Sequence, residues 1–241
     1  MIYLCLWGVL FIATAFNPAE RFPWMLENGL TILGIGFLIL TRNSLPFSRI
    51  SYTLIFIYTC LHTIGAYYTY SFVPYNQWSQ NLFGSSVNEW FGWERNNYDR
   101  LIHFLYGFLL AYPIREFILR ITSLRGFWGY FLPFDVTMST SMLYELIEWG
   151  AAVLFGAGSA AYIGSQGDVW DAQKDMSLAT IGALISMGIT LLINMKTQPN
   201  FKREFRDSIR LKRHQPYGED ELAHNMQAKA EMNKRKTKDQ P

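Results

Sequence analysis

The chain has 241 residues, of which 50% are hydrophobic and 17% charged, with a net charge of +2. The charge is segregated: residues 196–241 hold 12 Lys/Arg and 7 Asp/Glu, whereas the first 195 hold 9 and 12, with Lys174 as the single lysine. Apolar runs in this first region reach the roughly 20 residues that cross a bilayer. The composition therefore excludes a soluble enzyme, a nucleic-acid-binding domain and a disulfide scaffold, and indicates a membrane protein with a basic tail.

The apolar runs predict an all-α, polytopic transmembrane bundle of about six spans. Backbone polar groups inside a bilayer must be satisfied within the segment, and no run alternates as barrel strands do. The first run is the shortest, and Ala13-Thr14-Ala15 within it leaves a cleaved signal peptide as an alternative. The expected spans are Ile2–Phe16, Trp24–Thr41, Ile50–Val73, Asp99–Ile121, Pro133–Phe155 and Asp171–Met195.

Basic residues mark alternate connections and so predict the orientation. Arg42 and Arg49 flank the second connection, and Arg115, Arg120 and Arg125 surround the fourth. The other connections are mostly acidic. By the positive-inside rule, six spans then place both termini in the cytoplasm.

The tail, residues 196–241, is expected on the cytoplasmic face. Phe201, Phe205 and Ile209 recur every four residues among basic side chains, so Lys196–Arg213 is predicted to be an amphipathic helix on the anionic inner surface. Beyond Pro216 the polar sequence is typical of a mobile helix or of disorder. The lipid bilayer is the expected partner, and we expect no nucleic-acid role.

Ionisable residues gather on one side of this topology. A charged side chain inside a span costs a few kcal/mol on insertion scales, so each one needs a reason. They recur at helical spacing, which places them on shared faces near the outer ends of four spans. They are His62 on the third span, Asp99 and His103 on the fourth, Glu145 and Glu148 on the fifth, and Asp168, Asp171 and Asp175 at the start of the sixth.

So many carboxylates cannot all ionise in a low-dielectric site without countercharge. Arg100 and Lys174 are too few to neutralise them, which leaves shared protons or a bound divalent metal. Mixed imidazole and carboxylate ligands suit Zn, Mn or Fe, and carboxylates alone suit Mg or Ca. The candidate ligands are His62, Asp99, His103, Asp168, Asp171 and Asp175, with Gln166 and Gln173 beside Arg100 and Lys174 as supporting residues, and Glu145 or Glu148 as general base.

Four motifs carry a resemblance to a known family. They are His62–Tyr70, Asn97–Phe104, Tyr144–Trp149 and Gly164–Met176. Over about residues 1–195 the chain resembles the YjdF-like family of bacterial inner-membrane proteins. The resemblance implies a multi-span helical domain in the bacterial inner membrane, and it implies no activity.

Three functions remain open from the sequence. The first is a periplasm-facing metal site that acts on a lipid or envelope substrate, with one glutamate as base. The second is a transporter in which the same acids carry protons or a cation. The third is a structural or assembly protein whose acids form an ion-pair network. A polar path towards the cytoplasm would favour the second, and the sequence shows little of one.

Overall fold

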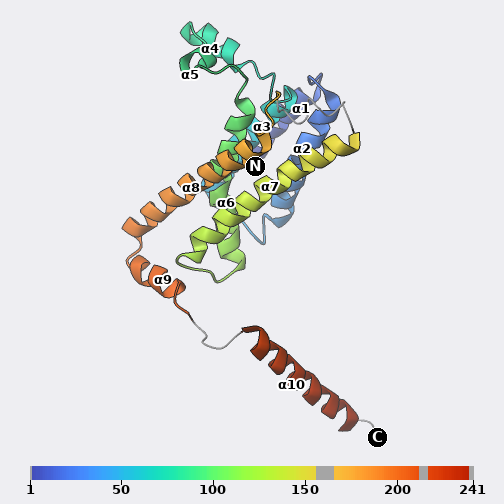
Figure 1. Ribbon diagram of the computed structural model, residues 1–241, viewed down its shortest axis with the longest axis vertical. Helices are drawn as coiled ribbons and strands as arrows, with labels where there is room; N and C mark the ends of the chain where they lie inside the picture. The colour runs from blue at the N-terminus through green and yellow to red at the C-terminus, as the bar shows by residue number, and fades with distance from the viewer. Residues whose placement is uncertain (1, 156–165, 212–216, 239–241) are drawn as a thin grey trace.

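The computed structural model describes residues 2–155, 166–211 and 217–238, and this part of the chain folds into helices with no strand (Figure 1). The helices that form the bundle are α1 (Ile2–Ala15), α2 (Arg21–Thr41), α3 (Arg49–Tyr67), α6 (Tyr98–Ile121), α7 (Trp128–Phe155) and α8 (Asp171–Thr197); outside it lie α4 (Tyr75–Phe83), α5 (Val87–Phe91), α9 (Phe201–Ser208) and α10 (Tyr217–Lys238). The predicted all-α bundle is confirmed.

Four of the described helices, α2, α3, α6 and α8, are long and apolar enough to cross a membrane. Helix α1 is apolar but shorter, with 14 residues. Helix α7 has 28 residues, enough in length, and carries Glu145 and Glu148 in its second half. Six spans therefore stay a prediction, although each of the six predicted segments contains a helix.

The third helix is shorter than predicted and ends at Tyr67 rather than Val73. Thr69 and Tyr70 take positive φ values of 50° and 51°, a left-handed conformation that stops an α-helix. The Tyr70 amide still donates to the Gly65 carbonyl at 2.8 Å, so the chain folds back on the helix end. This turn sends the Tyr70 ring into the bundle, where it reaches His62.

Helices α6 and α8 form the centre of the bundle because small residues let their backbones approach. A Cβ added to Gly107 would overlap the Ala179 carbonyl oxygen, and one added to Gly182 would overlap the Phe104 carbonyl oxygen. Ala179 and Ala183 on α8 are fully buried against this seam. The first turns of both helices, which carry the acids, are thereby held side by side.

The bundle has an α4–α5 end and, opposite to it, an α9 end, each named after the short helices that it carries (Figure 1). At the α4–α5 end, Ser86 and Glu89 form a capping box at the start of α5. At the α9 end, the Phe127 amide donates to Ser208 Oγ at 2.8 Å, and the Phe205 ring packs on Phe127. The amphipathic helix of the tail is thus shorter than the predicted Lys196–Arg213 and docks on the α6–α7 loop. Beyond it α10 is helical.

Candidate functional site

Three ionisable side chains from two helices converge at the α4–α5 end of the bundle. Asp99 and His103 lie one turn apart on α6, and Asp175 faces them from α8; one ligand atom from each lies within 4.8 Å of the other two. The close α6–α8 seam below them fixes this spacing. The structure thus brings together three of the six predicted ligands. Asp99, His103 and Asp175 are called the metal group because they are the candidate ligands that lie together.

Several oxygens of this group are buried without a hydrogen-bond partner. Asp175 is 2% exposed, and its Oδ1 has none in the described part of the chain; the same holds for Asp171 Oδ2 and Glu145 Oε1. A buried polar atom without a partner is rare and costly, and a bound water, ion or ligand would satisfy it. Asp175 and Glu145 both lie beside the His103 imidazole, and unpartnered carboxylate oxygens there are compatible with a bound cation.

Glu145 completes the group from α7. Its Oε1 lies 3.5 Å from His103 Nε2, and the same nitrogen lies 3.6 Å from Asp99 Oδ1. The Tyr144 ring stands edge-on to the His103 imidazole, at 6.0 Å between centroids. Of the two candidate bases, Glu145 therefore contacts the group directly, while Glu148 is buried one turn further along α7.

A cluster of opposite charges lies beside this group, at the loops that precede α6 and α8. Arg95 Nη1 donates to Asp171 Oδ1 at 2.7 Å, and Asp168 Oδ2 accepts from Arg100 and from Lys174 at 2.5 Å each. The Lys174 hydrogen bond, with the Trp170 amide and the Arg100 charge, lowers the pKa of Asp168 to about 2. Asp168 is thus committed to ion pairs. Arg95, in the loop before α6, was not predicted to join them.

His62 lies in a buried hydrogen-bond network with α2 and with the turn that follows α3. Its Nδ1 pairs with the Tyr70 hydroxyl at 2.7 Å and its Nε2 with the Glu27 carbonyl at 3.1 Å, so both ring nitrogens are engaged. The Glu27 carboxylate accepts from Tyr70 at 3.2 Å and also from Tyr144. The structure therefore does not bring His62 into the metal group.

Glu27 is the residue that the sequence argument missed. It is 2% exposed and links α2 to α3 and α7 through the network just described. It has no ionisable neighbour at helical spacing on its own span, which is why a search by spacing passes over it. Its position seven residues into an apolar helix was the available signal.

The two glutamines predicted to support the ligands, Gln166 and Gln173, lie elsewhere in the structure. Gln166 exchanges two hydrogen bonds with the Asn96 backbone, at 3.1 and 2.9 Å, and so fastens the loop before α8 to the loop before α6. Gln173 is exposed on α8. Neither side chain is found at the metal group in the described residues. Gly164 and Ser165 of the last motif lie outside them.

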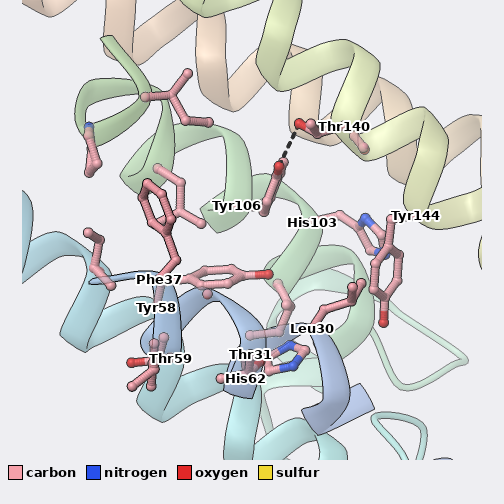
Figure 2. Close-up of a pocket in the computed structure, with 18 of the residues that line it drawn as sticks. Leu30, Thr31, Phe37, Tyr58, Thr59, His62, His103, Tyr106, Thr140 and Tyr144 are labelled. Atoms are coloured by element: carbon pink, nitrogen blue, oxygen red, sulfur yellow. Dashed lines mark hydrogen bonds between the residues drawn. The ribbon is translucent and has the colours of Figure 1, made fainter. Parts of the chain in front are cut away.

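A cavity of about 530 Å³ begins at the metal group and extends between α2, α3, α6 and α7 (Figure 2). Asp99, His103 and Tyr144 lie at its α4–α5 end, while leucine, isoleucine and phenylalanine side chains line most of the rest. Midway along, the Tyr106 hydroxyl donates to Thr140 Oγ1 at 2.7 Å. Its volume lies in the range of small-molecule sites.

Comparison with known proteins gives the family. Residues 1–196 match the family model "Predicted membrane protein (DUF2238)". The chain belongs to the DUF2238 family of membrane proteins. It is also 36% identical over 180 residues to inner membrane protein YjdF of Escherichia coli (strain K12), covering 74% of this chain and 82% of that relative. No solved structure matches the chain.

Membership of DUF2238 confirms the predicted family and the prediction that the chain is a membrane protein. The relative is by name an inner membrane protein, which agrees with the bilayer as the surroundings of this bundle. The match ends at residue 196, one residue before α8 ends, so the basic tail with α9 and α10 lies outside the family domain.

Proposed function

We propose that this DUF2238 domain holds a divalent metal ion at Asp99, His103 and Asp175, facing the periplasm, and uses it on a lipid or envelope substrate. The observation that carries the proposal is Asp175, whose Oδ1 is buried without a partner and whose carboxylate offers an oxygen within 4.8 Å of the other two ligands. The donor set is one imidazole and two carboxylates, which suits Zn, Mn or Fe.

The spacing of the donor atoms is compatible with a metal. Donor atoms on a tetrahedral zinc ion lie about 3.3 Å apart, and donor atoms on opposite sides of a calcium ion lie about 5 Å apart. The separations of up to 4.8 Å fit around the larger ion, and the side chains would have to move closer together to hold the smaller one. Asp171 Oδ2 is also buried without a hydrogen-bond partner in the described residues, while its Oδ1 accepts from Arg95.

In such a site Glu145 is the candidate general base. Its Oε1 is unpaired and close to His103, so it is placed to take a proton from a water molecule beside the metal. A divalent metal lowers the pKa of bound water and polarises a phosphoryl or carbonyl oxygen. Hydrolysis of an ester or phosphoester is the reaction class that this combination fits.

The cavity argues for this function over proton or cation transport. A transport path needs polar groups along its length, whereas below His103 most of the lining is hydrocarbon. Tyr106 and Thr140 satisfy each other there. An apolar chamber that begins at a polar group favours a substrate with an apolar part.

The ion-pair alternative predicts a protonated His103 between Asp99 and Glu145, with no metal. Elemental analysis of the protein purified in mild detergent separates the two. We expect about one equivalent of metal per chain, lost in Asp175→Asn and retained in Asp168→Asn, because Asp168 is already held by Lys174 and Arg100. Folded wild type without metal after reconstitution with Zn²⁺, Mn²⁺ or Ca²⁺ would overturn the proposal.

A further inference from the structure

The cavity below the metal group has a shape that restricts its ligand. Its lining on α6 runs from Asp99 to Phe117, which at 1.5 Å per residue is about 27 Å, nearly the depth of a bilayer's hydrocarbon core. The Phe37 ring packs on Phe117 at 5.9 Å and limits the inner end. At the outer end the Tyr144 hydroxyl bonds to Glu27. The chamber is therefore long for its volume of about 530 Å³.

The side of the cavity opens between α2 and α7. Leu30 and Phe37 on α2, and Leu143 and Ile147 on α7, line the cavity and are also 43–52% exposed on the surface. In a membrane-spanning bundle this surface faces lipid chains rather than water. A molecule that enters here comes from within the bilayer.

One polar group within the cavity wall is without a partner. Ser141 on α7 is 2% exposed, and its hydroxyl has no hydrogen bond in the described residues. It lies one helical turn inward from Glu145, about 6 Å along the axis. An ester carbonyl just below a lipid head group at the metal would lie at that depth and accept from Ser141.

We infer that the cavity holds one acyl chain of an ester-linked membrane lipid, with the head group at Asp99 and His103 and the ester carbonyl at Ser141. This inference rests on the proposed function for what happens to the head group. It names the substrate class of that site as a glycerolipid, admitted sideways between α2 and α7. The hydrocarbon lining fits the acyl chain, the unpaired Ser141 hydroxyl fits the ester carbonyl, and the lateral opening provides a route from the bilayer.

Two glycines on α2 supply a matched test. Gly34 lines the cavity and Gly36 does not, and an added Cβ at either meets nothing within 4 Å. Gly34→Phe therefore adds a ring to the cavity lining at a position with room for its Cβ, and Gly36→Phe adds the same ring elsewhere on α2. The probe is a phosphatidylethanolamine with a diazirine along one acyl chain, in vesicles of phosphatidylethanolamine and phosphatidylglycerol. Mass spectrometry of peptides after irradiation locates the label.

We expect label on Tyr58 and Tyr106, inside the cavity, lost in Gly34→Phe, lowered in Ser141→Ala and unchanged in Gly36→Phe. Label confined to the outward faces of the bundle, or unaffected by Gly34→Phe, would overturn the inference. Label unaffected by Ser141→Ala would overturn the assignment of the ester. Metal content measured on the same samples separates the two proposals. Bound metal without label in the cavity would support the metal site and overturn the lipid inference. Label in the cavity without bound metal would support the lipid inference and overturn the metal site.

Discussion

Removal of the Tyr70 hydroxyl tests the network that holds α2 and α3 together. This hydroxyl contacts both His62 Nδ1 and the Glu27 carboxylate, at 2.7 and 3.2 Å. Tyr70→Phe leaves His62 Nδ1 buried and unpaired and removes the hydroxyl that lies 3.2 Å from the Glu27 carboxylate. A buried polar group without a partner costs about 1–3 kcal/mol, so we expect a loss of about 2 kcal/mol of stability. For a chain of this size this lowers Tm by roughly 5 °C.

Thermal unfolding in mild detergent, followed by intrinsic fluorescence, measures the change. Tyr67→Phe is the matched control because Tyr67 lies at the end of the same helix, and its hydroxyl makes no hydrogen bond within the described part of the chain. We expect its Tm to stay at the wild-type value. Equal Tm values for Tyr70→Phe and Tyr67→Phe would refute the view that this network stabilises the bundle.

Three further predictions concern other parts of the fold. Gly182→Leu forces α6 and α8 apart and should lower Tm strongly, whereas Gly188→Leu, where the added side chain meets open space, should not. Asp168→Asn should destabilise the protein above pH 4 and have less effect towards pH 2: its folded pKa of about 2 lies below the usual value, so its contribution is lost as pH falls between the two. Phe205→Ser should release α9 and speed tryptic cleavage after Lys202 and Arg203, with unchanged rates contradicting the docked position.

Much of the fold could be predicted because spanning helices follow from run length. The start of α8 at Asp171 and the end of α6 at Ile121 agree with the predicted positions. The end of α3 could not be predicted, because residues 68–73 are as apolar and aromatic as a helix. They leave it only through the tertiary contacts that Tyr70 makes with His62 and Glu27.

The site was predictable where its members share a helix. Asp99 and His103 are four residues apart, and that spacing placed them on one face. The pairing of Arg100 with Asp168, and the arrival of Arg95 at Asp171, depend on how two loops meet and leave no periodic signal. For the same reason His62 appeared to be a ligand, although its partners on α2 and after α3 engage both ring nitrogens.

The metal ligands themselves are tested most directly by pulsed EPR of the Mn²⁺-loaded protein. The account predicts a bound Mn²⁺ with ¹⁴N coupling from one imidazole, absent in His103→Gln and present in His62→Gln, because the His62 nitrogens already bond to Tyr70 and Glu27. Nitrogen coupling that persists in His103→Gln, or a Mn²⁺ signal that stays that of the free aqueous ion, would contradict a metal held by Asp99, His103 and Asp175.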